Sequence, residues 1–189
     1  MRLTEKVQDI LRHTLTTGEI AIDATAGNGY DTLGMAQAVG PDGRVIAIDI
    51  QQAALNVTRE RLDQAGFTNT CDLRLGDHSK ILASLEDEFS QQVKIITFNL
   101  GYLPGSDKAI QTTSETTLPA LSSACRLLKP NGQLLVTAYR GHPGGLSEAA
   151  AVADFFTQLP ASEWTCQTFE PKVNSDRVPP ILHVAMKLK

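Results

Sequence analysis

Short apolar runs typical of buried strands alternate with amphipathic segments typical of helices along this chain of 189 residues. The expected strands lie at residues 19–23, 44–49, 70–75, 93–99 and 133–139, the last after a turn at Pro130-Asn131-Gly132. The expected helices lie at residues 3–15, 30–39, 52–65, 79–85, 117–128 and 146–159. Because two parallel strands need a crossover of roughly a dozen residues, this alternation predicts a parallel sheet with helices on both faces.

The C-terminal part of the chain departs from this alternation. Two further strand-like runs, Trp164–Phe169 and Ile181–Met186, are separated only by a loop that contains Pro179 and Pro180. No crossover helix fits this loop, so we expect the two strands to pair antiparallel. The predicted fold class is therefore α/β, with a mainly parallel seven-stranded sheet ending in an antiparallel hairpin. This is the Rossmann-like class I methyltransferase arrangement, here expected as one domain over residues 1–189.

Composition excludes several classes of protein. The 17 basic and 21 acidic residues give a net charge of −4, which argues against broad non-specific binding to nucleic acid but allows a local basic face. No stretch approaches the roughly 18 apolar residues of a spanning helix, so we expect no membrane segment and a cytoplasmic protein. Three widely spaced cysteines fit neither a disulfide framework nor a zinc site, so we predict no metal and expect reduced, buried thiols.

A small-residue loop follows the first expected strand, which ends at Asp23. Its Gly27-Asn28-Gly29 run, called the glycine loop below, lies where a doubly wound sheet opens its crevice and where glycine lets the backbone approach a ligand. Asp49 ends the second strand about twenty residues later, where a carboxylate can accept the hydroxyls of a ribose, with Gln51 beside it for the adenosine. The alternatives are an ordinary tight turn and, for Asp49, a helix cap.

Asp77 and His78 follow the third expected strand and so belong to the same edge of the sheet. A carboxylate at this position can receive the amino group of an adenine. The alternative is that Asp77 caps the next helix.

The residues around the glycine loop discriminate between two cofactors. A pyrophosphate-binding fingerprint requires a third glycine where this chain has Thr32, and Asp31 would repel a pyrophosphate. S-adenosylmethionine carries a positive sulfonium and an amino-acid tail, which suit Asp23, Asn28 and Asp31. The sequence therefore predicts S-adenosylmethionine as the cofactor.

The run Asn99-Leu100-Gly101-Tyr102 follows the fourth strand and should reach the same crevice. It is similar to the Asn-Pro-Pro-Tyr pattern of amino-group methyltransferases, in which the Asn holds a nitrogen nucleophile and the aromatic ring packs on a planar group. Asn99 and Tyr102 are therefore the candidate catalytic residues, although Leu100 and Gly101 replace the two prolines. The alternative is that Asn99 merely caps a loop.

Two glycine-rich loops at the same edge carry the candidate substrate-binding residues Lys108, Arg140 and His142. Such side chains on loops can seat a substrate or its phosphates. The alternative is that these loops are plain surface turns.

Six runs taken together resemble one family. They are residues 23–32, 49–51, 98–105 with Asp107 and Lys108, 116–118, Tyr139 with Gly141 and His142, and Pro179 with Pro180. The family is the putative rRNA methylase family, which includes bacterial tRNA 5-(aminomethyl)uridine methyltransferases. Ser106 and residues 173–177 depart from its pattern.

The resemblance implies an enzyme that methylates the side-chain nitrogen of a 5-aminomethyl-(2-thio)uridine at the tRNA wobble position. Its partner would be the anticodon stem-loop of tRNA. The other functions that remain open are methylation of another RNA or of a small-molecule amine, and a non-enzymatic cofactor-sensing module. The sequence does not choose between a monomer and a homodimer.

Overall fold

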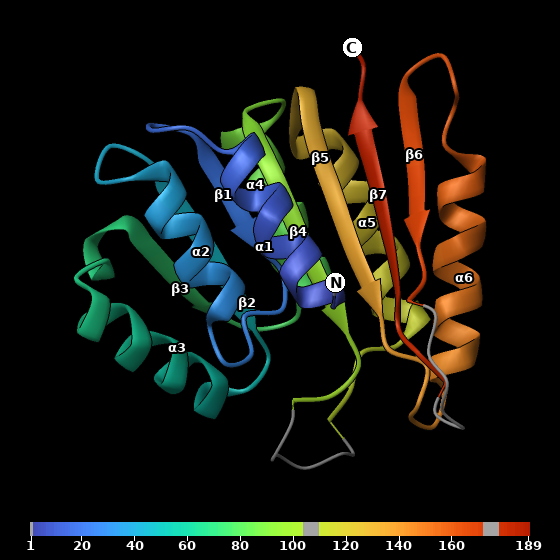
Figure 1. Cartoon of the computed structure of the whole chain (residues 1–189), viewed down its shortest axis with the longest axis horizontal. Coiled ribbons are helices and arrows are strands. Elements are labelled where there is room, and N and C mark those ends of the chain that lie inside the picture. Colours follow the sequence, from blue (N-terminus) through green and yellow to red (C-terminus); the bar gives the residue numbers. More distant parts are fainter. Residues whose placement is uncertain (1, 104–109, 172–177) are drawn as a thin grey trace.

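The described residues of this computed structural model, 2–103, 110–171 and 178–189, form one seven-stranded sheet between two layers of helices (Figure 1). The strands are β1 (Ile20–Asp23), β2 (Arg44–Asp49), β3 (Cys71–Leu75), β4 (Val93–Leu100), β5 (Leu128–Ala138), β6 (Trp164–Phe169) and β7 (Ile181–Lys187). The helices are α1 (Leu3–Thr14), α2 (Tyr30–Val39), α3 (Gln52–Ala65), α4 (His78–Phe89), α5 (Ser114–Leu127) and α6 (Gly145–Gln158), with a short 3-10 turn η1 (Thr68–Thr70).

The strand order β3-β2-β1-β4-β5-β7-β6 places the ligand crevice. The strands β1 to β5 are parallel, and β7 is antiparallel to both of its neighbours, β5 and β6. The predicted α/β class and the antiparallel pairing of the last two strands are thus confirmed. Because β1 has β2 on one side and β4 on the other, the chain connections diverge there, and a crevice opens beyond the C-terminal ends of β1 and β4.

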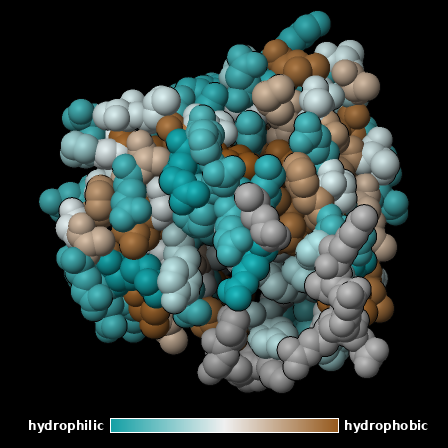
Figure 2. Space-filling model, in the orientation of Figure 1, coloured by the Kyte–Doolittle hydropathy of each residue, from teal (hydrophilic) through white to brown (hydrophobic). Residues whose placement is uncertain are grey.

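Two apolar cores hold the helices on the sheet. One lies under α4, α5 and α6, and the other under α1, α2 and α3. Successive residues of β4 serve opposite cores, since Ile95 belongs to the second core and Ile96 to the first. This two-sided burial explains why the central strands are continuous apolar runs. The outer face of α1 is mostly hydrophilic in Figure 2.

Three details differ from the sequence expectations. The expected turn at residues 130–132 lies within β5, whose register against β4 shifts between Val93 and Ile95, and Asn131 has a positive φ of 60°. The helix α4 extends to Phe89, beyond the expected end at residue 85. Cys71 and Cys125 are only half-buried, and Cys166 is exposed because it lies on the edge strand β6, so the expectation of three buried thiols is wrong for Cys166 and met only in part by the other two. Among the described residues, no helix is both long enough and apolar enough to cross a membrane.

Candidate functional site

A cavity of about 1460 Å³ opens at the C-terminal edge of the parallel strands. It collects most of the predicted site residues: Gly27, Asn28, Asp31, Asp49, Gln51, Asp77, His78, Asn99, Tyr102, Arg140 and His142. Asp23 and Gly29 are absent from its wall, and Lys108 lies outside the described residues. The sequence thus predicted a set of side chains that the fold does bring together.

The carboxylate of Asp49 supports the glycine loop. Its Oδ2 accepts a hydrogen bond from the Gly27 backbone N–H at 2.9 Å, and its Oδ1 accepts one from the Gln51 N–H at 2.9 Å. Burial raises the pKa of Asp49, while these N–H donors oppose the rise. Gly29 has a φ of +74°, and a Cβ there would lie 2.9 Å from Thr58, so both the conformation and the packing require glycine. The loop is therefore held in place with its backbone along the cavity.

Asp23 acts from beneath this loop. It is fully buried, and its Oδ2 accepts a hydrogen bond from the Thr32 hydroxyl at 2.7 Å. Burial and then the nearby charge of Asp31 raise the pKa of Asp23 to about 7. Its carboxyl group links β1 to α2. Because this side chain is fully buried, Asp23 supports the loop and does not reach the cofactor directly, as the sequence had predicted it would.

Asn99 has a fixed side-chain orientation. Its Nδ2 donates a hydrogen bond to Asp31 Oδ2 at 2.8 Å, and its backbone N–H donates to Thr25 Oγ1 at 2.7 Å. The other oxygen of Asp31 accepts a hydrogen bond from Gln8 of α1. Because the amide nitrogen is engaged by a carboxylate, the amide oxygen of Asn99 is the atom left to accept a hydrogen bond.

Gln8 was not predicted as a site residue. It lies 23 positions before Asp31, and the sequence around it reads as an ordinary polar face of a helix. Burial raises the pKa of Asp31, and the N–H groups of Asn99 and Gln8 oppose that rise. The site thus includes a polar contact from α1 that no local motif signals.

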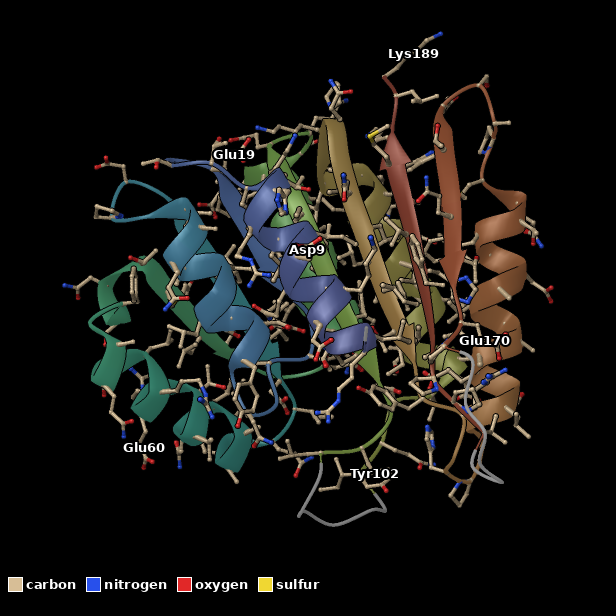
Figure 3. All side chains as sticks on the ribbon, viewed as in Figure 1. Asp9, Glu19, Glu60, Tyr102, Glu170 and Lys189 are labelled. Atoms are coloured by element: carbon tan, nitrogen blue, oxygen red, sulfur yellow. The ribbon has the colours of Figure 1, made fainter. Side chains whose placement is uncertain are left out.

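Tyr102 and His142 meet at the rim of the cavity, where Figure 3 shows Tyr102 below the end of β4. Their rings make an edge-to-face contact with centroids 6.0 Å apart. Nδ1 of His142 lies 3.1 Å from Gln111 Oε1 and 3.0 Å from the Pro143 carbonyl oxygen. Both neighbours are acceptors, so Nδ1 carries a hydrogen, while Nε2 is buried and has no hydrogen-bond partner among the described residues.

Gly101 explains the departure from the Asn-Pro-Pro-Tyr pattern. Its φ is +153°, and a Cβ at this position would lie 3.4 Å from the Cβ of Tyr139 and 3.6 Å from His142 Nε2. Proline fixes φ near −65° and so cannot adopt this conformation. The loop after β4 therefore follows a different backbone path from a double proline, and that path makes room for His142.

Asp77 caps α4, as the alternative reading proposed. Its Oδ1 accepts hydrogen bonds from the Ser79 backbone N–H at 2.8 Å and the Ser79 hydroxyl at 2.7 Å. Burial acts to raise the pKa of Asp77, but the Ser79 donors outweigh it and the pKa is lowered. His78 beside it is buried with its ring edge-on to Phe98, and burial lowers its pKa. Contact of either residue with an adenine stays a prediction.

Arg140 is engaged within the protein. Its Nε donates a hydrogen bond to the Pro179 carbonyl at 2.7 Å, its terminal nitrogen forms an ion pair with Glu170, and only 16% of its side chain is exposed. The guanidinium thus ties the loop after β5 to the end of β6 and to the start of β7. The predicted phosphate contact would have to displace Glu170, so we assign Arg140 a structural role instead.

Models of two known protein families match parts of the sequence. The model described as putative rRNA methylase matches residues 45–186. The chain belongs to this family. A model of protein-L-isoaspartate(D-aspartate) O-methyltransferases matches residues 2–82, which contain β1, β2, β3 and the glycine loop. Membership of the putative rRNA methylase family confirms the resemblance seen in the sequence.

Two solved structures of high similarity confirm the methyltransferase fold. A putative rRNA methylase from Clostridium thermocellum is 32% identical, with a TM-score of 0.92 over 100% of this chain and 98% of that one. A putative methyltransferase from Streptococcus mutans, solved in complex with SAH, is 33% identical, with a TM-score of 0.86 over 100% of this chain and 99% of that one. The predicted use of S-adenosylmethionine agrees with that complex, since SAH is the product of this cofactor.

A curated relative in Arabidopsis thaliana is named chloroplastic tRNA (mnm(5)s(2)U34)-methyltransferase. It is 41% identical over an alignment of 177 residues that covers 89% of this chain. The matched part spans 64% of the length of the plant protein.

Proposed function

We propose that this chain is an S-adenosylmethionine-dependent N-methyltransferase. Its substrate would be the 5-aminomethyl group of (2-thio)uridine at the tRNA wobble position, and its product 5-methylaminomethyl-(2-thio)uridine. The family and the plant relative support the substrate. The observation that carries the chemistry is the 2.8 Å hydrogen bond from Asn99 to Asp31, which leaves an amide oxygen to hold an amine at the cavity.

The residues at the glycine loop fit S-adenosylmethionine. The Asp49 carboxylate suits ribose hydroxyls, and Ile50 next to it keeps 61% of its surface exposed on the cavity wall, which suits the flat face of an adenine. Ligand pockets are commonly about 300–1,000 Å³, so a cavity of about 1460 Å³ has room for a nucleoside beside the cofactor. When bound, this cofactor supplies an electrophilic methyl group on a positively charged sulfonium.

The chain's own residues would position the acceptor. The Asn99 amide oxygen accepts an N–H of the substrate amine, which directs the nitrogen lone pair away from Asn99 and towards the methyl donor. Tyr102 offers an aromatic ring at the rim for a planar group such as the uracil. Holding two reactants in this way is worth several kcal/mol of the barrier, because translational and rotational freedom is lost before the reaction.

The amine must be neutral when it attacks. Alkyl amines resemble the lysine side chain, whose pKa is about 10.4, so most of the substrate is protonated at neutral pH. His142 and His78 both line the cavity, but Nε2 of each ring is buried, and Nδ1 of His142 is engaged by Gln111 and Pro143. The amine therefore loses its proton to water in this proposal, before it attacks the methyl donor.

The test compares two tRNAs that differ only at the wobble base. The purified protein and S-adenosylmethionine are incubated with tRNA carrying 5-aminomethyluridine and with the same tRNA carrying uridine, and the nucleosides are analysed by mass spectrometry. We expect the methyl group only on the aminomethyl nitrogen of the first tRNA. Equal methylation of both tRNAs, a methyl group on a ring atom or ribose oxygen, or transfer only to small amines would reject the proposal. Cytoplasmic location stays a prediction, and the choice between a monomer and a homodimer stays open.

A further inference from the structure

An exposed aromatic ring stands at the mouth of the cavity. Tyr30 is the first residue of α2, follows directly after the glycine loop and keeps 64% of its surface exposed. It lines the same cavity as Asn28 and Asn99. Tyr30 also directly precedes Asp31, whose carboxylate orients Asn99. The ring therefore lies on the wall of the same cavity that contains Asn99, the residue proposed to hold the acceptor.

Arg61 of α3 is stacked on this ring. The centre of its guanidinium lies 3.8 Å from the ring centroid of Tyr30. Its Nε donates a hydrogen bond to the Asn28 carbonyl at 2.7 Å, so the glycine loop holds the guanidinium in place. Among the described residues, no carboxylate forms an ion pair with Arg61. The pair thus combines a fixed aromatic face with a positive charge that no acidic side chain neutralises.

This combination matches the chemistry of a nucleotide. Single-stranded RNA is bound by stacking of its bases on aromatic side chains and by contacts of arginine with its phosphates. A base that has left the anticodon stack exposes a flat face of the kind that Tyr30 could cover. The two terminal nitrogens of Arg61 have a geometry suited to phosphate oxygens.

We propose that Tyr30 and Arg61 form a binding subsite for the nucleotide next to the one that is methylated. The base of this nucleotide stacks on the face of the Tyr30 ring opposite Arg61. The terminal nitrogens of Arg61 contact the phosphate of the same nucleotide. This inference rests on the proposed function, since it requires an RNA substrate. Arg61 also places a cation next to two cavity-lining residues, Tyr30 and Asn28, whereas the charge of Arg140 is already neutralised by Glu170.

The first test concerns the ring. Binding of an anticodon stem-loop carrying 5-aminomethyluridine is measured for the wild type, Tyr30→Ala and Tyr30→Phe, and SAH binding is measured by calorimetry. Because a stacked base is worth about 1–3 kcal/mol, Tyr30→Ala should weaken RNA binding about 5- to 150-fold. Tyr30→Phe keeps the ring and should stay within about 2-fold of the wild type, and SAH affinity should change by less than about 3-fold in both variants.

The second test concerns the charge. Each phosphate contact adds about one unit to the slope of the logarithm of RNA affinity against the logarithm of salt concentration. Arg61→Ala should lower this slope by about one unit, and Arg61→Lys should retain most of it. Arg59→Ala is the matched control, because Arg59 is an exposed arginine of the same helix, whereas Arg61 is the one stacked on Tyr30 and bonded to Asn28, and the slope for Arg59→Ala should be unchanged.

The outcomes separate this subsite from other roles. Unchanged RNA affinity in Tyr30→Ala, or equal slopes in Arg61→Ala and Arg59→Ala, would overturn the proposal. Parallel losses of SAH and RNA affinity would assign the pair to the cofactor and also overturn it. If the wild type does not bind the stem-loop at all, the proposed function fails, and this inference fails with it. If the wild type binds the stem-loop and both Tyr30→Ala and Arg61→Ala bind it with the same affinity, only the subsite is rejected.

Discussion

The side-chain nitrogen of Asn99 donates a 2.8 Å hydrogen bond to Asp31, and the second oxygen of Asp31 accepts a hydrogen bond from Gln8. Three elements, β4, α2 and α1, therefore meet at one carboxylate. A carboxylate with both oxygens engaged in this way sets the orientation of the Asn99 amide. Asp31 therefore positions Asn99, and Asn99 is the residue that would contact the substrate amine.

Replacing Asp31 should disturb catalysis more than cofactor binding. In Asp31→Asn, one of the two N–H donors loses its acceptor, so the Asn99 amide can flip and present nitrogen to the amine. Hydrogen bonds to charged groups contribute about 1.5–3 kcal/mol, so we expect kcat to fall about 10- to 100-fold. Single-turnover methylation and SAH calorimetry measure the two effects separately. An equal loss of SAH affinity would instead make Asp31 a direct cofactor ligand.

An exchanged pair tests the orientation itself. In the double variant Asp31→Asn with Asn99→Asp, an amide at position 31 donates to a carboxylate at position 99, which keeps a free oxygen towards the amine. The double variant should recover part of the activity lost in Asp31→Asn. Activity no higher than that of either single variant would show that the hydrogen bond does not act through orientation.

Removal of the Asn99 side chain should lower kcat much more than it weakens cofactor binding, because the lost contact orients the nucleophile and not the donor. The rate of the wild type should also rise with pH until the substrate amine has lost its proton. Pre-steady-state rates over a range of pH, with saturating substrates, measure both effects. A rate independent of pH would mean that a step other than amine attack limits turnover.

Asp49 should contribute to cofactor affinity. Asp49→Ala removes both the expected contact with the ribose and the support of the Gly27 N–H, which is held at 2.9 Å. We expect S-adenosylmethionine binding to weaken by roughly 1–3 kcal/mol. Asp77→Ala is a useful comparison, because its carboxylate caps α4 and its loss should lower stability instead. Unchanged affinity in folded Asp49→Ala, measured by calorimetry, would contradict the assignment.

Asp23 should make stability depend on pH. Its pKa in the folded state is about 7, above the ordinary value of 3.8, because burial and then Asp31 disfavour its charged form. The stability linked to the protonated carboxyl is fully present below the ordinary pKa and is lost as the pH rises through about 7. Asp23→Asn stays neutral, so its stability relative to the wild type should increase by on the order of 2 kcal/mol between about pH 5 and about pH 8. Denaturant unfolding at the two pH values measures this difference, and a constant difference would show that Asp23 is not held protonated.

Arg140 should matter for stability and not for the salt dependence of RNA binding. Arg140→Ala breaks the ion pair with Glu170 and the hydrogen bond to Pro179, which should cost about 1–3 kcal/mol because the side chain is only 16% exposed. Glu170→Gln, which removes only the charge of the partner, should cost less. A flatter salt dependence of tRNA binding in Arg140→Ala, at unchanged stability, would restore the phosphate role expected from the sequence.

The sequence by itself determined the elements and the place of the site. Apolar periodicity identified the helices and strands, because burial on one or two faces leaves a pattern within a few residues. The loop between the last two strands, with no room for a crossover helix, predicted their antiparallel pairing. Gly27 and Asp49 could be assigned because their role depends on position at the end of a strand, which is a local property.

The tertiary structure alone decided which side chains act on one another. It placed β7 between β5 and β6, gave Asp77 the cap of α4, and paired Arg140 with Glu170. The contacts of Asp31 with Gln8 and Asn99 span 23 and 68 positions of sequence, and the stacking of Arg61 on Tyr30 joins two different helices. No local pattern encodes such contacts, because they arise only when the packing of both cores sets the distances between elements that are far apart in the chain.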